Sequence, residues 1–557
     1  MSSQKKTRLR VIPLGGLDEI GKNMTVFEYG QDMVVVDAGL MFPDDDHPGV
    51  DLILPDYSYI VKRKDKLRGI VITHGHEDHT GALPYLLKDL GHPVPILGTK
   101  LTLGLIAGKL EEQKIKRPKL REVRAGGHVS LGVFGFDFMA VNHSIPDGVA
   151  TLIRTPVGNV LHTGDFKLDQ TPIDGRLTDY GAIAKAGRQG VLLLMSDSTN
   201  AERRGITRSE AEVGESLRQI FAEAEQRIIV ASFASHIHRI QQICDAAVAV
   251  GRKVAVTGRS MVNNTRIARQ LGYLDIDDEN IIDAYEMKDM APEDVVVLST
   301  GSQGEPLSAL ARIANGDHRT VNVESGDTVV ISASPVPGNE RAVGRVINRL
   351  ARAGAVVKSR ENSDVHVSGH AAGEELKLML NLVKPRYFMP IHGETRHLQA
   401  HARLAEATGV GHEDIFVLEN GDCLEMDENR AEVREHVESG VVYVDGLSVG
   451  EVGQVVLRDR QLLARDGIAT VVIAIDGQTG RPMGEPELVM RGIVFGPEQD
   501  ALLEDARARL AKTLAKTAGE GATDHQVIKN AVRESLSQFL WERSHLRPMI
   551  IPVVMEV

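Results

Sequence analysis

Residues 73–81 bring together side chains that could bind metal ions, in the order Thr-His-Gly-His-Glu-Asp-His-Thr-Gly. A short apolar run precedes them and predicts a strand that ends at the cluster. Because alternate side chains of extended backbone point the same way, His74 and His76 can bind one ion together. Beyond the turn, Asp78 and His79 can reach a second ion. A polar loop with unrelated histidines is the weaker interpretation, since four potential ligands lie in one H-x-H-x-D-H run.

Three later segments each end an apolar, strand-like run with another potential ligand: His143, Asp165 in a Thr-Gly-Asp turn, and His392 before Gly-Glu. Taken singly, a histidine at a strand end is more often a hydrogen-bonding partner than a ligand. In this order after H-x-H-x-D-H, the segments resemble the metallo-β-lactamase superfamily. The resemblance implies two ligand groups and a bridging carboxylate: His74, His76 and His143; Asp78, His79 and His392; and Asp165. Such ligands suit Zn²⁺ and Mn²⁺ alike.

Composition favours a large globular enzyme. The chain has 557 residues, of which 42% are hydrophobic and 25% charged, and this length suggests about three or four domains. No apolar run is long enough to span a membrane, and the N-terminus lacks the apolar core of a secretion signal. Cys244 and Cys423 are the only cysteines, which favours reduced thiols over a disulfide scaffold. We therefore expect a soluble, cytoplasmic protein that makes no membrane contact.

The net charge of −13 makes non-specific binding to duplex nucleic acid less favourable. It does not exclude a channel for single strands that is lined by a few cations and metal ions. Basic residues cluster in residues 109–121, which form either part of such a surface or a solvated helix end.

The pattern of apolar runs predicts an inserted domain. Up to about residue 208, short β-rich runs alternate with turns, as in a sheet-on-sheet core with outer helices. Residues 209–360 instead alternate buried strands with helical patterns, which is typical of a doubly wound parallel α/β domain. Because His392 follows this domain, the domain interrupts the metal-binding fold. The expected boundaries are 1–208 and 361–449 for the metal-binding domain, 209–360 for the insertion, 450–469 for a linker and 470–557 for a small α+β domain.

A second set of motifs lies around the insertion. Asp197 ends a strand before it, Ser232 and Ser235 follow its first strand, and residues 366–370 return the chain to the metal-binding domain. Ligands bind where parallel strands end, and hydroxyl groups and glycine amides there suit phosphate. Singly, each Ser/Gly turn is more often a plain loop. As a set, these motifs resemble the β-CASP subfamily of metallo-β-lactamase nucleases, and Asp197 and His370 match its acidic and histidine motifs.

Over nearly its whole length the chain resembles the ribonuclease J family of that subfamily. The matching strings include residues 14–24, Leu-Gly-Gly-Leu-Asp-Glu-Ile-Gly-Lys-Asn-Met, and residues 300–306, Thr-Gly-Ser-Gln-Gly-Glu-Pro. The resemblance implies an α/β fold: a metallo-β-lactamase αββα sandwich, an inserted doubly wound β-CASP domain and a small α+β C-terminal dimerisation domain. It also implies a homodimer or higher oligomer and partners in an RNA-degradation complex.

The implied activity is hydrolysis of single-stranded RNA in RNA maturation and decay. RNA with a 5′-monophosphate would be degraded 5′→3′, with some internal cleavage. Two divalent ions can activate a water and polarise a phosphodiester. Asp78, Asp197 and His370 are the catalytic candidates. Asp78 is a ligand that could also orient the nucleophile, and His370 could contact the scissile phosphate and exchange a proton. Asp197 could either hydrogen-bond a metal-binding histidine or carry a proton for the leaving group. The expected substrate-binding residues are His366, Val367, Ser368, Gly369 and His370, with Ser232 or Ser235.

A third ion site is a further expectation. Gly49, Asp51 and Asp445 match positions that hold a structural divalent ion such as Ca²⁺ in some relatives. Aspartates in solvated turns are the alternative interpretation.

Other functions remain open from the sequence. A small-molecule metallo-hydrolase would need neither the large insertion nor the pair Asp197 and His370. A non-catalytic RNA-binding protein is disfavoured because every expected metal ligand is present. A DNA nuclease of the same superfamily stays open, because no contact to a 2′-hydroxyl can be located.

Overall fold

The structure is a computed structural model that describes residues 7–44, 46–303, 308–335, 339–446, 448–493 and 499–557. Residues 304–306 of the Thr-Gly-Ser-Gln-Gly-Glu-Pro string therefore lie outside the described residues. The chain forms two compact units, Met1–Phe42 with Leu52–Val442 and Pro43–Asp51 with Tyr443–Val557. Within the described ranges, no helix has the length and apolar character needed to cross a membrane.

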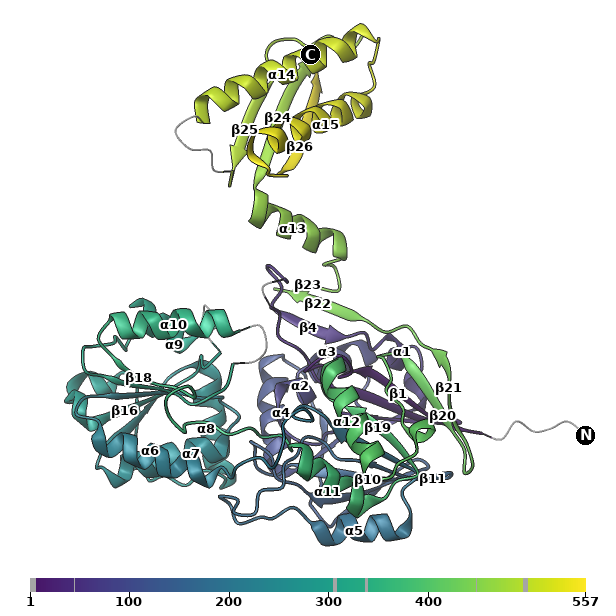
Figure 1. The fold of residues 1–557 in the computed structure, drawn as a ribbon, viewed down its shortest axis with the longest axis vertical. Helices are drawn as coiled ribbons and strands as arrows, with labels where there is room; N and C mark the ends of the chain where they lie inside the picture. The colour runs from purple at the N-terminus through teal and green to yellow at the C-terminus, as the bar shows by residue number, and fades with distance from the viewer. Residues whose placement is uncertain (1–6, 45, 304–307, 336–338, 447, 494–498) are drawn as a thin grey trace, which may run out of the picture. The chain divides into compact units, whose positions relative to one another are not determined.

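Two β-sheets form the centre of the first unit (Figure 1). In spatial order, the larger sheet contains β21 (Ala431–His436), β20 (Asp422–Met426), β1 (Leu9–Gly15), β2 (Met24–Tyr29), β3 (Asp32–Val36), β5 (Leu67–Val71), β6 (Pro95–Gly98) and β7 (Lys119–Glu122). The smaller sheet contains β19 (Tyr387–Ile391), β12 (Leu193–Asp197), β11 (Gly158–His162), β10 (Val149–Thr155), β9 (Phe134–Ala140) and β8 (His128–Leu131).

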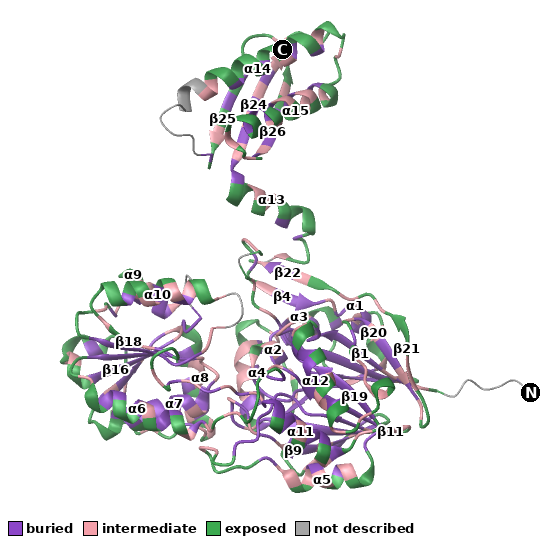
Figure 2. Cartoon of the chain, in the orientation of Figure 1, coloured by how far each residue is buried: buried purple, intermediate pink, exposed green. Residues whose placement is uncertain are grey.

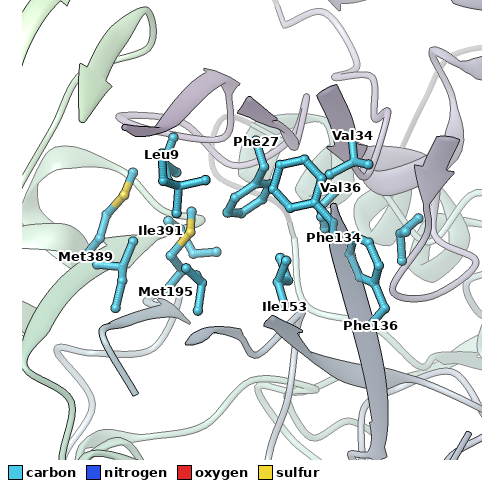
Figure 3. Close-up of a cluster of buried hydrophobic side chains, with 14 of the residues drawn as sticks. Leu9, Phe27, Val34, Val36, Phe134, Phe136, Ile153, Met195, Met389 and Ile391 are labelled. Carbon is cyan, nitrogen blue, oxygen red and sulfur yellow. The ribbon is translucent and has the colours of Figure 1, made fainter. Parts of the chain in front are cut away.

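Buried apolar side chains fill the space between these sheets (Figure 3). Phe27 of β2 and Val36 of β3 meet Phe136 of β9 and Ile153 of β10 in one cluster. Burying such side chains stabilises the fold by roughly 25 cal/mol per Å² of apolar surface. The candidate ligands follow the ends of β5, β9, β11 and β19, which belong to these packed sheets.

Helices cover the outside of this sandwich, as expected. α5 (Tyr180–Gln189), α11 (Gly373–Val383) and α12 (Thr395–Ala407) pack on the smaller sheet through one apolar cluster. α4 (Lys100–Glu112) contacts β6 and β7 of the larger sheet. The remaining short elements of the unit are β4 (Leu52–Pro55), α1 (Ser58–Val61), α2 (Glu77–Thr80) and α3 (Leu83–Leu90).

The insertion is a parallel sheet with helices on both faces, which confirms the doubly wound expectation. Its strand order is β15 (Ile281–Asp283), β14 (Lys253–Val256), β16 (Val295–Ser299), β13 (Ile228–Ala231), β17 (Thr328–Ile331) and β18 (Val356–Lys358). One face packs on α6 (Ala211–Glu223), α7 (Ile237–Ala249) and α8 (Arg259–Leu271), and the other on α9 (Ala309–Asn315) and α10 (Glu340–Arg352).

Two glycines let the insertion approach the sandwich closely. A Cβ atom added to Gly104 of α4 would lie 2.6 Å from Leu271 Cδ1 of α8, and one at Gly108 would lie 3.2 Å from Ile267 Cδ1. Larger residues at these positions would push α4 and α8 apart.

The second unit contains the hairpin partners β22 (Val441–Asp445) and β23 (Ser448–Val449), a helix and a small α+β domain. Where a linker was expected, the structure has helix α13 (Gln454–Asp466), followed directly by β24 (Ile468–Ile475). β24 pairs antiparallel with β25 (Glu487–Arg491) and parallel with β26 (Met549–Glu556). α14 (Gln499–Gly519) and α15 (His525–Ser544) cover one face of this sheet.

Candidate metal centre

His74, His76 and His143 bring three imidazole rings together after strands β5 and β9. The Nδ1 atom of His76 lies 3.1 Å from Nε2 of His74 and 3.2 Å from Nε2 of His143. Nitrogen lone pairs that converge at this spacing need a proton or a cation among them. The three residues therefore fit the first predicted metal site, and their ligand atoms lie within 4.8 Å of one another.

Asp165 joins this group to a second one. Its Oδ2 atom lies 3.8 Å from His74 Nε2 on one side, and 3.2 Å from His79 Nε2 and 3.3 Å from His392 Nε2 on the other. Asp78 Oδ2 completes the second group at 3.6 Å from His79 Nε2. The structure thus brings together every ligand inferred from the sequence, with the carboxylate expected to bridge lying between the groups.

Neighbouring groups orient three of the imidazoles. The nitrogen turned away from the centre meets an oxygen in each case: Asp37 Oδ2 at 2.8 Å from His79 Nδ1, the Gly369 carbonyl at 2.8 Å from His143 Nδ1, and Thr73 Oγ1 at 3.1 Å from His74 Nδ1. Such contacts fix the ring and leave its Nε2 atom to bind metal. Sequence reasoning missed Asp37, and its place directly after the apolar strand β3 is too common a pattern to single it out.

Electrostatics keeps the first group neutral, which is the form of histidine that binds metal. Burial and neighbouring imidazoles hold the pKa values of His74 and His76 well below the usual range. Burial, only partly opposed by Asp165, lowers the pKa of His143 to about 3. For His392, burial acts in the same direction, but the adjacent Asp165 carboxylate outweighs it and raises the pKa to about 9.

The conspicuous string at residues 14–24 positions the ligand loops. Asn23 donates from its backbone N–H and from Nδ2 to the Asp78 carbonyl, at 3.0 and 3.2 Å. Leu17 and Glu19 form isolated β-bridges with Gly393, next to the ligand His392. Asp18 and Lys22 of this string adopt left-handed backbone, at φ 61° and 53°, and so does His392 at φ 55°. The string therefore contributes to the metal centre without supplying a ligand.

The buried Asp197 and the partly buried His370 form a pair beside the candidate ligands. Asp197 Oδ2 lies 2.8 Å from His370 Nδ1, and the His370 ring centroid lies 4.9 Å from that of His143. Burial lowers the pKa of His370, but the nearby Asp197 carboxylate more than offsets it and raises that pKa above its usual value. The pair leaves the Nε2 atom of His370 available to a substrate.

The residues expected to bind substrate form the loop that carries His370. Ser368 Oγ accepts a hydrogen bond from Asn200 Nδ2 at 2.8 Å, so its own hydroxyl hydrogen remains to be donated. A Cβ atom added to Gly369 would lie 2.7 Å from His143 Cε1, which explains why only glycine fits there. Val367 is buried, and the buried His366 Nδ1 atom has no hydrogen-bond partner among the described residues.

The inserted domain contributes the loop after β13 to this region. Ser232 Oγ and His236 Nε2 are buried and lack hydrogen-bond partners among the described residues, while Ser235 is only partly buried. His236 is close enough to help lower the pKa of both His76 and His366. This loop therefore lies near both His76 and His366.

The buried ion pair of Arg239 and Glu210 supports this loop. Sequence reasoning did not predict this pair. Arg239 donates from Nε and Nη2 to the two oxygens of Glu210, and from Nη1 to the Val365 carbonyl at 2.8 Å. Burial raises the pKa of Glu210, but Arg239 outweighs burial and holds that pKa well below the usual value. The pair thus joins the inserted domain to the segment that leads into His366.

The three residues expected to bind a structural ion lie close together, but the Arg460 guanidinium lies among them. Arg460 Nη1 donates to the Gly49 carbonyl at 3.1 Å, and Arg460 Nη2 lies 2.5 Å from Asp445 Oδ2. Asp51 Oδ2 accepts from the Gly446 N–H at 2.7 Å. With their oxygens already bonded in this way, Gly49, Asp51 and Asp445 do not fit a divalent ion.

Family models match four consecutive parts of the chain. They are the metallo-beta-lactamase superfamily over residues 17–203, the ribonuclease J beta-CASP domain over 225–350, the Zn-dependent metallo-hydrolase RNA specificity domain over 354–418, and the ribonuclease J C-terminal domain over 455–557.

Curated relatives match the chain over nearly its full length. The chain is 45% identical to ribonuclease J of Mycolicibacterium smegmatis, covering 99% of this chain and 97% of that protein. It is 43% identical to ribonuclease J2 of Bacillus subtilis, with both chains covered completely. A solved structure of a protein of unknown function from Enterococcus faecalis matches 75% of this chain and 100% of its own, with a TM-score of 0.53 at 15% identity. At that identity, the last match shows the fold alone.

Proposed function

Because the chain belongs to the ribonuclease J family and is thus a metal-dependent ribonuclease, we propose that it degrades single-stranded RNA 5′→3′ from 5′-monophosphate ends. Some internal cleavage accompanies this activity, which serves RNA maturation and decay in the cytoplasm. The proposal is carried by the loop of residues 366–370, in which Gly369 and His370 contact the ligand groups and the buried His366 Nδ1 atom has no hydrogen-bond partner among the described residues. Family membership does not favour the small-molecule hydrolase or DNA nuclease alternatives.

Two divalent ions, Zn²⁺ or Mn²⁺, would be held by the two histidine groups and Asp165, and would supply a hydroxide nucleophile and a polarised phosphodiester. Asp78, whose side chain is 30% exposed, is placed to orient the nucleophile. In-line attack on phosphorus breaks its bond to the 3′ oxygen. His370 Nε2 then gives a proton to that oxygen, while Asp197 stabilises the charged imidazole through Nδ1.

The preference for a 5′-monophosphate follows from hydrogen-bonding groups that lack partners. His366 Nδ1 and Ser232 Oγ are both buried and unbonded among the described residues. Leaving such groups unpaired costs about 1–3 kcal/mol each. A terminal phosphate would satisfy them, together with the Ser368 hydroxyl, the Gly369 amide and, on the exposed side, Ser235. A 5′-hydroxyl end lacks those oxygens, and a triphosphate is bulkier.

The C-terminal domain supports a homodimer. β24 alternates strictly between partly buried and buried residues, and its buried residues pack against α14 and α15. The other face of the sheet exposes Val489, Ile551, Val553 and Met555, each 38–47% accessible. Figure 2 colours the strands of this sheet as a mixture of buried, intermediate and exposed residues. A contiguous exposed apolar face is typical of an interaction surface. We assign it to a second copy of the chain, and partners in an RNA-degradation complex would bind elsewhere.

Matched RNAs with monophosphate, triphosphate or hydroxyl 5′ ends test the pocket. The wild-type protein should release mononucleotides fastest from the monophosphate, and Ser368→Ala should reduce that preference roughly tenfold, as expected for about 1.4 kcal/mol. Ser216→Ala, on α6 of the inserted domain, is the matched control and should behave as wild type. Equal rates on all three ends, or an unchanged preference in Ser368→Ala, would contradict the pocket.

A further inference from the structure

Arg460 connects helix α13 to two other parts of the second unit. Its Nη1 atom donates to the carbonyls of Pro48 and Gly49, at 3.3 and 3.1 Å, and its Nη2 atom lies 2.5 Å from Asp445 Oδ2. One side chain thus joins residues 43–51, the end of β22 and the helix that leads into the C-terminal domain.

The acceptors around this guanidinium are those that a hard cation would choose. Backbone carbonyl and carboxylate oxygens are the usual ligands of Ca²⁺ in proteins. They converge because the Asp51 N–H donates to the Val444 carbonyl at 2.8 Å, and Asp51 Oδ2 accepts from the Gly446 N–H at 2.7 Å. Hydrogen bonds of the Asp51 and Gly446 N–H groups therefore hold the oxygen cluster in place. The positive charge within the cluster is the Arg460 guanidinium.

The turn at Gly49 is shaped around the guanidinium. Gly49 has φ 75°, and an added Cβ atom would lie 2.8 Å from Arg460 Nη1 and 3.3 Å from Cζ. The neighbouring Gln461 donates from Nε2 to the Asp46 carbonyl at 2.6 Å, which holds the same turn against the same helix. Arg460 and Asp445 are only 31% and 34% exposed.

We propose that Arg460 replaces a divalent cation at this position, so that the second unit is held together without binding Ca²⁺. A guanidinium is always charged and directs several N–H groups in one plane, so it can bind a carboxylate and carbonyls at once. The attachment of α13 to the turn at Pro48 and Gly49 then does not depend on cation supply. Removing Arg460 would leave an acidic oxygen cluster open to a divalent ion.

Trp541 allows a test on the intact chain. It is the only tryptophan and lies in α15 of the second unit, so its fluorescence reports unfolding of that unit and not of the metal centre. Thermal unfolding of the desalted full-length protein would be followed at increasing Ca²⁺. Wild type should show one midpoint that Ca²⁺ does not change. Arg460→Ala should unfold roughly 4 °C lower, and millimolar Ca²⁺ should restore most of the difference.

Arg458→Ala, two positions away on the exposed side of α13, is the control and should match wild type. Arg460→Lys keeps a charge but cannot reproduce the forked contacts, so it should lie between wild type and Arg460→Ala. A wild-type midpoint that rises with Ca²⁺ would overturn the proposal. So would an Arg460→Ala variant that is as stable as wild type, or one that is destabilised yet insensitive to Ca²⁺.

Discussion

Asp37 is buried and accepts hydrogen bonds from the Thr73 N–H at 2.8 Å and from the Thr73 hydroxyl, besides holding His79 Nδ1. The candidate ligands were predictable because four of them stand in one H-x-H-x-D-H run and the other three each end an apolar, strand-like run. Asp37 was not, because a single carboxylate after a strand is common and only the folded chain places it behind His79. Asn23 was missed as a functional residue for the same reason, since its partner lies 55 residues away.

Asp37→Ala should weaken metal binding, because His79 loses the group that fixes its orientation. Changes to such supporting residues typically cost about 10–100-fold in metal affinity. The measurement is the Mn²⁺ concentration that gives half-maximal RNA cleavage. Asp32→Ala, at the start of the same strand, removes a partly exposed ion pair with Arg68 and a hydrogen bond from the Val133 N–H, and should leave the metal requirement unchanged. An Asp37→Ala protein with a wild-type metal requirement would refute this role.

At the scale of elements, the ligand helix α2 lies directly against the chain after β3. The Leu40 N–H donates to the Glu77 carbonyl at 3.1 Å, and the Ala38 N–H donates to the His79 carbonyl at 2.8 Å. The sandwich and the inserted α/β domain could both be predicted, because period-two and continuous apolar runs differ clearly. Residues 450–469 were expected to be a linker, and the structure forms helix α13 there, of which only Leu457 and Asp466 are buried.

Gly39→Ala should disrupt the second ligand group while the domain stays folded. The added Cβ atom would lie 1.6 Å from the Asp78 carbonyl oxygen, so the ligand loop would have to move. We expect RNA cleavage to fall by at least about 100-fold, as misplacement by about 1 Å can cause, with unchanged circular dichroism. Gly344→Ala on α10 meets no atom within 4 Å and serves as the control. Full activity in Gly39→Ala would contradict this close approach.

Arg239→Met should destabilise the inserted domain strongly at neutral pH. Breaking a buried ion pair costs about 3–5 kcal/mol, because Glu210 keeps an uncompensated charge. In the wild type the pKa of Glu210 is lowered, so its contribution is present above the unfolded value and is lost as pH falls. In the variant, burial without Arg239 raises that pKa instead, so protonation relieves the cost.

The difference in unfolding free energy between the two proteins should therefore be larger at pH 7.5 than at pH 5. Denaturant unfolding at both pH values measures it. Arg218→Met, whose partner Glu215 is 79% exposed, should change stability by less than about 1 kcal/mol at either pH. A pH-independent difference for Arg239→Met would contradict the buried charge.

For the whole molecule, the division into two compact units separates the candidate metal centre from the proposed dimer surface. All candidate ligands, Asp197 and His370 lie in the first unit, and the exposed apolar sheet face lies in the second. The sequence indicated the small α+β domain through its strand and helix patterns. It could not indicate which face of the sheet is free, because that depends on where α14 and α15 pack.

Truncation before Thr470 should yield monomers with poor activity. The smaller change Val553→Asp places a charge on the exposed sheet face and should also give monomers, while leaving the chain folded. Sedimentation and single-turnover RNA cleavage would measure assembly and activity, and Lys512→Asp on α14 is the surface control. A Val553→Asp protein that remains a dimer would exclude this face as the dimer interface.

The most direct test of the central claim uses one single-stranded RNA with a 5′-monophosphate and different labels at its two ends. In Mn²⁺, the wild-type protein should release the 5′ label as a mononucleotide while the 3′ label remains on long fragments. His76→Ala should fold normally but leave both labels on intact RNA. Early release of mononucleotides from the 3′ end, or undiminished cleavage by His76→Ala, would contradict a metal-dependent 5′→3′ exoribonuclease.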